Sequence, residues 1–278
     1  MQTFHAAPDW QTAITIDNTA MAETFTHQGG TLQVTRAGSA AAPLRLLLLH
    51  GWKQPASSLL PVISTLQAAH SIIALDTPGN GVAPEPPATW GLPDYVDLVA
   101  AFMATQPNVP TVIVCHSFGA RLAMHLAARH VPWLRGVVVI GGHGLRPVRP
   151  LGRQLKVWAI TRVTKIAGFI DRLFGLGLKA KWASRFGSAD YRSAGSLRDV
   201  FVRIVADDVA PLTPQVNVPV ILIYGENDTE TPPSMAQRYH ALLPHSELVI
   251  LPREDHYSVL TSSVVATQAK TFIQKVLS

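Results

Sequence analysis

The residues best suited to nucleophilic chemistry are a serine, an aspartate and a histidine that lie far apart in the sequence: Ser117, Asp228 and His256. A serine hydroxyl becomes a useful nucleophile only when a base removes its proton, and histidine can serve as that base. The histidine in turn needs a carboxylate that holds its tautomer and stabilises its charged form. The three residues therefore predict a site with Ser117 as nucleophile, His256 as base and Asp228 as orienting acid.

Two backbone amides are placed to hold the negative charge that such an attack creates. A serine on a sharp strand-to-helix turn puts the next residue, Phe118, at a helix N-terminus, where free N–H groups and the helix dipole favour an anion. The run His50-Gly51-Trp52 also follows an apolar stretch and offers the N–H of Trp52. We expect these two amides to form an oxyanion hole, worth on the order of 3–4 kcal/mol per donor.

All of these groups lie just after short apolar runs that predict strands. The runs are residues 44–49, 72–75, 112–114, 137–140, 220–224 and 248–251, after early short strands around Ile14, Ile16, Met21, Phe25, Leu32 and Val34. Helical periodicity separates them, over residues 59–69, 95–103, 120–129, 234–243 and 262–277. Repeated strand–helix units predict an α/β fold with a doubly wound, mostly parallel sheet and helices on both faces. Such sheets bind ligands at the carboxyl ends of their strands.

The alternation of strand and helix is interrupted in one basic segment. Residues 144–210 contain 13 Lys and Arg against 5 Asp and Glu, whereas the whole chain has a net charge of +5. We therefore expect residues 144–213 to form a helical cap, inserted after the sixth strand. The core of the fold would then comprise residues 1–143 and 214–278.

Within this cap, residues 151–174 have the periodicity of an amphipathic helix with a wide apolar face. The favoured target of that face is the catalytic core, where it would line an apolar acyl pocket. A basic amphipathic helix can also lie on an anionic membrane surface, which is a less favoured alternative. The third alternative is an ordinary solvated face.

The motifs closely resemble those of the α/β-hydrolase fold, in their placement after strands and in the chain order Ser, Asp, His. The matching runs are HGW (50–52), DTPGNG (76–81), CHSFG (115–119), GENDTETP (225–232) and EDH (254–256). The resemblance implies that Ser117 is the nucleophile, Asp228 the triad acid and His256 the base. It also implies that Trp52 and Phe118 hold the oxyanion-hole positions.

One residue of the nucleophile motif departs from the family pattern. Cys115 replaces the first glycine of the turn, at a position where the family also accepts other small residues. The nucleophile itself excludes some relatives, because haloalkane dehalogenases and the epoxide hydrolases of this fold attack with a carboxylate. A serine at position 117 favours acyl chemistry instead.

Five further side chains are candidates for the substrate pocket: His116, His143, Trp158, Arg162 and Tyr257. His116 adjoins the nucleophile and either lines the pocket or packs under the cap. Arg162 projects close to the apolar stripe and either extends its stem to solvent, which we favour, or meets an anionic substrate group.

Other carboxylates have alternative interpretations. Asp207 and Asp208 are substitute candidates for the triad acid, but they lie where the chain returns from the cap rather than after a strand. Asp76 opens a turn rich in Pro and Gly and is interpreted as structural. Glu254 and Asp255 precede the histidine and are interpreted as solvated loop charges.

Composition and missing motifs narrow the class of protein. Neither a Walker-type phosphate loop nor a G-x-G-x-x-G run follows the first strands, so no nucleotide cofactor is expected. The single cysteine excludes an intrachain disulfide and a cysteine-based zinc site. We expect no metal, no organic cofactor and no nucleic-acid partner.

Location and assembly are expectations of the same kind. The chain has no apolar run long enough for a membrane span and no evident signal peptide, which predicts a cytoplasmic protein. A monomer and a homodimer both remain open.

These observations predict a serine hydrolase that cleaves carboxylic esters of small to medium, largely apolar acyl groups. The main alternative is a C–C bond hydrolase of a ring-cleavage diketone acid, whose carboxylate would meet basic cap residues. Lactonase, thioesterase and peptidase activities are further alternatives. From a different class, the chain could be a non-catalytic small-ligand receptor on the same fold, although a receptor has no need of a complete triad.

Overall fold

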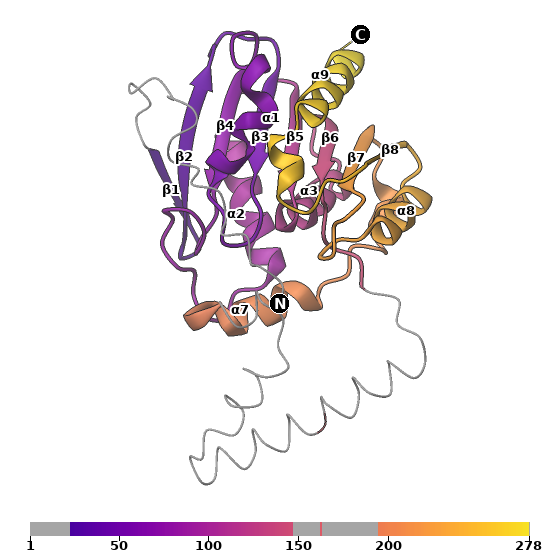
Figure 1. Ribbon diagram of the computed structural model, residues 1–278. Coiled ribbons are helices and arrows are strands. Elements are labelled where there is room, and N and C mark those ends of the chain that lie inside the picture. Colours follow the sequence, from indigo (N-terminus) through magenta and orange to yellow (C-terminus); the bar gives the residue numbers. More distant parts are fainter. Residues whose placement is uncertain (1–22, 147–161, 163–193, 278) are drawn as a thin grey trace, which may run out of the picture.

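The computed structural model describes residues 23–146, 162 and 194–277. Eight strands form one sheet in the order β1-β2-β4-β3-β5-β6-β7-β8 (Figure 1). The strands are β1 (Glu23–His27), β2 (Gly30–Gly38), β3 (Arg45–Leu49), β4 (Ser71–Asp76), β5 (Thr111–His116), β6 (Leu134–Ile140), β7 (Val220–Gly225) and β8 (Ser246–Leu251). β2 runs antiparallel to both of its neighbours, and every other pair is parallel. The predicted mostly parallel α/β sheet is confirmed.

The burial of each strand explains its sequence pattern. β3 and β5 are buried at every position, as expected for parallel strands covered on both faces, and they therefore consist of nearly continuous apolar runs. β2 lies near the antiparallel edge, and buried residues alternate with more exposed ones along most of its length. Phe25 lies in β1, and Leu32 and Val34 lie in β2, as predicted. The expected strand residues Ile14, Ile16 and Met21 lie outside the described residues.

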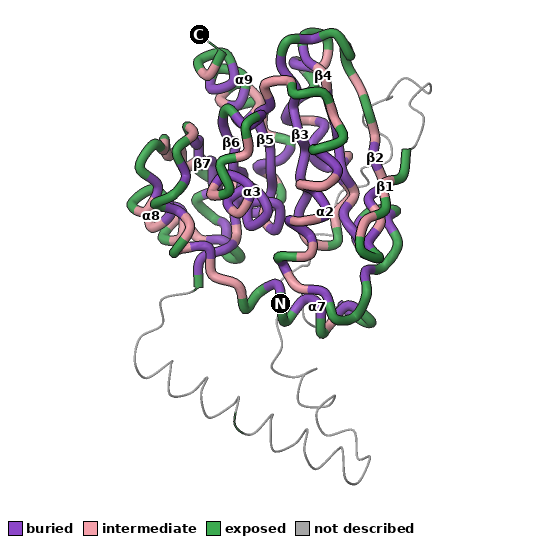
Figure 2. Tube along the Cα trace, turned by 180° about the vertical axis from the view of Figure 1, so that it is seen from behind, coloured by how far each residue is buried: buried purple, intermediate pink, exposed green. Residues whose placement is uncertain are grey.

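Helices cover both faces of the sheet. They are α1 (Leu60–Ile63), α2 (Leu92–Ala104), α3 (Phe118–Ala128), α7 (Arg198–Ala206), α8 (Pro233–Leu242) and α9 (Ser263–Leu277). Alternate residues of β3 divide between two hydrophobic clusters: Leu47 and Leu49 pack with residues of α2, α3 and α8, whereas Leu46 and Leu48 pack with residues of α1 and α9. Figure 2 shows this buried interior along β3, β5 and β6. The sheet is therefore covered on both faces, as a doubly wound fold requires.

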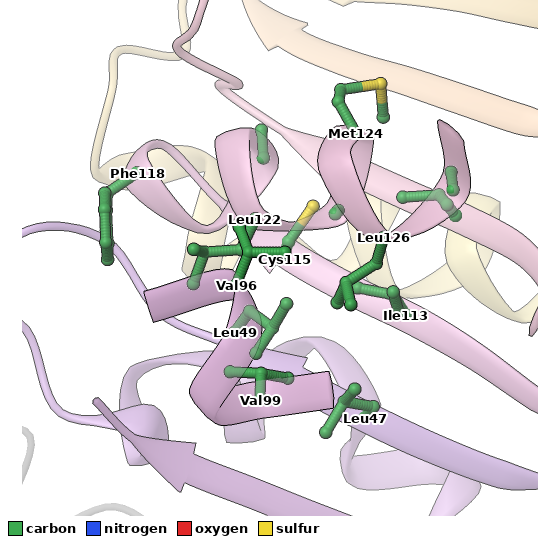
Figure 3. Close-up of a cluster of buried hydrophobic side chains, with 14 of the residues drawn as sticks. Leu47, Leu49, Val96, Val99, Ile113, Cys115, Phe118, Leu122, Met124 and Leu126 are labelled. Carbon is green, nitrogen blue, oxygen red and sulfur yellow. The ribbon is translucent and has the colours of Figure 1, made fainter. Parts of the chain in front are cut away.

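The first of these clusters supports the turn that follows β5. Figure 3 shows Leu122 and Leu126 of α3 above Ile113 and Cys115 of β5, with Leu49 of β3 close by. Cys115 is fully buried, and its thiol points to the carbonyl oxygen of Val138 at 3.4 Å. The residue that replaces a glycine of the family pattern thus serves as a small core side chain beneath the helix.

Two predicted elements need comment. The helix predicted over residues 59–69 is shorter than expected, since α1 spans four residues between the short 3₁₀ turns Ala56–Leu59 and Ser64–Leu66. Most of the predicted cap, including the amphipathic run 151–174 apart from Arg162, lies outside the described residues. Its described return contains α7, which lies beyond the carboxyl ends of the strands (Figure 1). None of the described helices is long and apolar enough to cross a membrane.

Candidate active site

Ser117 occupies a strained turn between β5 and α3. Its backbone has φ 46° and ψ −107°, a conformation that non-glycine residues rarely adopt and that costs about 1–3 kcal/mol. Its N–H donates to the carbonyl of Ile140 on the next strand (3.1 Å), and its side chain is part-exposed. A Cβ at Gly119 would lie 2.2 Å from the carbonyl oxygen of Leu49, so only glycine permits this approach of helix to strand. The turn therefore presents the hydroxyl at the sheet edge.

Asp228 and His256 form a buried hydrogen-bonded pair. The Nδ1–H of His256 donates to Oδ2 of Asp228 at 2.8 Å, and both residues are less than 5% exposed. Thr231 adds a bond from its hydroxyl to Oδ2 and one from its N–H to Oδ1, both 2.7 Å. Burial acts to raise the pKa of Asp228, but the bonds from His256 and Thr231 outweigh it and lower that pKa below its ordinary value. Asp228 is thus ionised and accepts from His256.

The chain segments around Ser117 and His256 meet at the same edge. The ring of His116, next to the serine, lies 4.7 Å from the ring of His256, measured between centroids. The Ser117 hydroxyl makes no hydrogen bond to the described residues, so no bond joins it to His256 in this structure. The other ring nitrogen of His256, Nε2, lies 3.6 Å from Oε2 of Glu230.

One of the two predicted oxyanion donors lies in the loop after β3, and the other lies at the start of α3. The indole of Trp52 packs edge-on against the ring of Phe118, with 5.8 Å between centroids. Phe118 is the first residue of α3, so the helix leaves its N–H unbonded. Across residues 23–146, 162 and 194–277, no acceptor takes the N–H of either residue. Both donors are available for an anion.

The loop that carries Trp52 is fixed by contacts on both sides of it. The Gly51 N–H donates to Gln54 Oε1 (3.3 Å), and the Lys53 N–H donates to Asn80 Oδ1 (2.7 Å). His50 anchors the start of the loop, because its Nδ1–H donates to the Gly51 carbonyl (2.7 Å). Nε2 of the same ring accepts the N–H of Thr77 (3.0 Å). Trp52 therefore lies between two N–H groups that already have partners.

The other predicted pocket residues have different surroundings. His116 is fully buried, and both its ring nitrogens face protein groups. Nδ1 of His143 accepts from Arg121 (3.1 Å), and burial together with that cation lowers the pKa of His143 to about 3. Tyr257 is 39% exposed, and its ring meets the His256 ring edge-on at 5.2 Å. Arg162 is helical and exposed. Trp158 lies outside the described residues.

The alternative acids lie in contacts away from the histidine. Oδ1 of Asp207 contacts Nε2 of His125 (3.1 Å), and Oδ1 of Asp208 accepts the N–H of Ala210 (3.2 Å). Asp76 accepts the backbone N–H groups of Ala56 and Val82, which agrees with a structural role. Asp255 is not merely a solvated loop charge, because its Oδ1 accepts the N–H groups of the two residues that follow His256. That oxygen therefore helps to hold the histidine loop.

Four residues that contact the candidate site were not predicted from the sequence: Gln54, Asn80, Thr231 and Glu230. Asn80, Thr231 and Glu230 lie inside the motif runs DTPGNG and GENDTETP. These motifs could have indicated that the three residues lie near the site, but nothing in the sequence indicated which contacts they make. Gln54 lies two residues beyond the HGW run. No group of three or more potential metal-ligand side chains occurs among the residues described.

The strained turn at Ser117, the buried pair of His256 and Asp228 and the open amides of Trp52 and Phe118 lie at one edge of the sheet. Comparison with known families agrees with the fold: residues 46–268 match the model of the alpha/beta hydrolase family. The chain belongs to that family.

Curated relatives and solved structures refine this placement. A pimeloyl-[acyl-carrier protein] methyl ester esterase of Neisseria meningitidis is 25% identical over 267 residues, covering 88% of this chain and 81% of the relative. A 2-(acetamidomethylene)succinate hydrolase of Mesorhizobium japonicum is 25% identical over 258 residues, covering 87% and 90%. The crystal structure of a lipase-like protein from Acinetobacter baumannii superposes with a TM-score of 0.67 at 18% identity, covering 92% of each chain. This last likeness concerns the fold alone.

Proposed function

We propose that this protein is a serine hydrolase that cleaves carboxylic esters through an acyl-enzyme intermediate. The observation that carries the proposal is the buried bond from Nδ1 of His256 to Asp228, which directs Nε2 of the same ring away from the carboxylate. An imidazole held in this tautomer is a base at Nε2. Membership of the alpha/beta hydrolase family and the similarity to methyl ester esterases support an ester as the substrate.

The reaction follows from the roles of these groups. Ser117 Oγ attacks the ester carbonyl while Nε2 of His256 takes the hydroxyl proton, and the amides of Trp52 and Phe118 hold the oxyanion. The tetrahedral intermediate collapses when the imidazolium gives that proton to the leaving alcohol. Water then repeats the sequence on the acyl-enzyme and releases the acid. Asp228 stabilises the imidazolium in both halves.

The favoured acyl group is small to medium and largely apolar. The rings of Trp52, Phe118 and Phe201 pack together beside the oxyanion loop, and the ring centroids of Trp52 and Phe201 lie 5.2 Å apart. Phe201 belongs to α7, so the return of the chain from the predicted cap covers the oxyanion loop. Residues 144–213 are proposed to complete the pocket as a cap.

A second candidate is hydrolysis of a substrate that carries a carboxylate. It is favoured by the similarity to a relative whose named substrate is a substituted succinate. In this version, basic residues of the segment 144–213, with Arg162 among them, would meet the carboxylate. The C–C bond hydrolase of a diketone acid falls in the same group, because its substrate is also an acid.

The experiment is covalent labelling combined with ester turnover. A fluorophosphonate probe should label wild type on Ser117, and p-nitrophenyl acetate and butyrate should be hydrolysed. Ser117→Ala should abolish labelling and lower turnover by at least about 10³-fold. Ser234→Ala is the matched control, since Ser234 is an exposed serine. Unchanged turnover by Ser117→Ala would refute the mechanism, and faster cleavage of a dienoic ring-cleavage product than of the esters would favour the second candidate.

Location and assembly remain proposals. We propose a cytoplasmic protein, monomeric or homodimeric, whose partner is a small-molecule ester. The single cysteine, Cys115, is free and buried, which agrees with a reducing compartment without requiring it. Contact of the basic segment with an anionic membrane remains the less favoured alternative. Sedimentation with anionic vesicles at low salt would test it.

A further inference from the structure

His116 lies between the loop of the oxyanion hole and the loop of the catalytic histidine. Its Nε2–H donates to the carbonyl oxygen of His256 at 3.0 Å, and its Nδ1 lies 2.9 Å from Oε1 of Gln54. The side chain is 0% exposed, and its ring lies against that of His256. Both nitrogens are therefore engaged by protein groups on opposite sides of the ring.

Gln54 continues this connection to the oxyanion donor. Its Oε1 accepts the N–H of Gly51, and its own N–H donates to the Gly51 carbonyl at 3.1 Å. A Cβ at Gly51 would lie 2.7 Å from His116 Nδ1 and 2.6 Å from Gln54 Oε1, so the three residues are in close contact. The next residue after Gly51 is Trp52. A shift of Gln54 would therefore shift the amide that is to hold the oxyanion.

We propose that His116 is a positioning residue that fixes the oxyanion loop and the histidine loop relative to Ser117. This inference rests on the proposed function and adds a role for a residue that touches no reacting atom. The nucleophile, the base and the oxyanion donor lie on three different loops, and a misplacement of about 1 Å in such a set can cost 10²-fold in rate. His116 is joined to the first by the chain, to the second by the His256 carbonyl and to the third through Gln54.

The chemistry of the ring suits this role. The His256 carbonyl can only accept, so Nε2 of His116 carries the proton. Burial and the nearby His256 ring lower the pKa of His116 well below its ordinary value, which keeps the ring neutral. Nδ1 can then only accept, so it pairs with Gln54 when the side-chain NH2, rather than Oε1, faces the ring. In that orientation of the amide the connection to Gly51 runs through the backbone N–H of Gln54. The bridge thus spans the site without placing a charge beside the catalytic base.

Two substitutions separate the two halves of the bridge. The amide oxygen of asparagine can replace the accepting Nδ1, and the amide nitrogen of glutamine can replace the donating Nε2. His116→Asn should keep the contact with Gln54 and lose the bond to the His256 carbonyl, whereas His116→Gln should do the reverse. We expect each to lower kcat for p-nitrophenyl butyrate by about 10- to 100-fold and to leave KM within about twofold, because both loops act in the transition state.

The partner residue supplies a second, independent test. Gln54→Met keeps the length of the side chain and removes its polar atoms, and it should lower kcat by a similar factor. In the His116→Gln background, where the contact with Gln54 is already lost, adding Gln54→Met should change kcat by less than about twofold. Gln215→Met at an exposed glutamine is the control and should match wild type.

The readouts distinguish failure of this inference from failure of the proposed function. All rates are normalised to the concentration of Ser117 that the fluorophosphonate labels, so misfolded protein does not contribute. Absence of label on wild-type Ser117 would remove the proposed function itself. If wild type is labelled and both His116 variants keep wild-type kcat, the positioning role is wrong, even if Tm falls. A rise in KM alone would also overturn it, because that result indicates a residue that lines the pocket.

Discussion

Thr231 holds the carboxylate of Asp228 at both oxygens, with its hydroxyl 2.7 Å from Oδ2 and its N–H 2.7 Å from Oδ1. Oδ2 is also the atom that accepts the Nδ1–H of His256. The threonine hydroxyl and the imidazole therefore share one acceptor, and the carboxylate cannot rotate without breaking a bond to Thr231. Thr231 thus fixes the orientation of Asp228, and Asp228 in turn orients His256, the proposed base.

Removal of the Thr231 hydroxyl should loosen the pair. Thr231→Val preserves the shape of the side chain and leaves a buried carboxylate oxygen with one bond fewer, a loss of about 1.5–3 kcal/mol for a bond to a charged group. We expect kcat/KM to fall about tenfold and the free energy of unfolding to fall by about 1.5–3 kcal/mol. Thr231→Ser retains the hydroxyl and should stay within threefold of wild type. Equal activity of the valine and serine variants would show that the Thr231 hydroxyl does not orient Asp228.

Substitution of Asp228 tests which aspartate serves His256. Asp228→Asn can present its amide nitrogen to Nδ1, which favours the tautomer that carries the proton on Nε2 and so removes the base. We expect kcat to fall by about 10³- to 10⁴-fold, with KM little changed. Asp207→Asn is the matched control, because Asp207 instead contacts His125. Greater loss of kcat in Asp207→Asn than in Asp228→Asn would show that the acid is misassigned.

Glu230 should influence the pH dependence of the reaction. Its carboxylate lies 3.6 Å from Nε2 of His256, where it favours the charged imidazole and so delays formation of the base as the pH rises. Glu230→Gln should therefore move the acidic limb of the kcat/KM profile to lower pH. The glutamate side chain is 42% exposed, so solvent screens the interaction and the shift should be less than about 0.7 of a pH unit. Glu226→Gln, at another exposed glutamate of the same loop, should leave the acidic limb in place. A shift of the limb to higher pH in Glu230→Gln would show that Glu230 does not stabilise the charged imidazole.

Three neutral histidines, two buried and one half-buried, should make the fold sensitive to acid. Burial lowers the pKa of His50, His116 and His143 below the ordinary 6.5, to about 3 for His143. Below pH 6.5 the unfolded chain takes up protons at these positions and the folded chain does not, so the free energy of unfolding falls as the pH falls. Each histidine contributes about 1.4 kcal/mol per pH unit in the range between its folded and unfolded pKa. Above pH 7 they contribute no slope.

Urea unfolding followed between pH 4.5 and 8 would measure this slope. His116→Gln removes one of the three groups and should reduce the slope below pH 6 by about one third of their summed contribution. His240→Gln changes an exposed histidine and should not alter it. A stability that is constant from pH 8 to pH 5 would contradict this prediction, because it would mean that the folded chain takes up protons as readily as the unfolded chain.

The order of the elements and the placement of the three candidate catalytic residues followed from local patterns. Continuous apolar runs identify strands that are buried on both faces, and a parallel sheet brings the carboxyl ends of its strands to one edge whatever the loops do. Ser117, Asp228 and His256 each follow such a run, so their convergence could be predicted without coordinates. The amides of Trp52 and Phe118 followed for the same reason, since one begins a helix and the other follows a strand.

The contacts between loops were decided by the tertiary structure. Whether His116 lines a pocket or spans two loops depends on ring orientation and on the path of residues 51–54, which no periodicity encodes. The hydrogen bonds of Thr231 to Asp228 and the position of Glu230 beside His256 likewise depend on loop dihedral angles and rotamers. These are set by contacts between residues distant in the sequence. The sequence by itself thus determined which chemical groups meet at the sheet edge. The tertiary structure alone decided how they are held, because hydrogen bonds act over about 3 Å whereas sequence patterns specify position only to within a turn or a strand end.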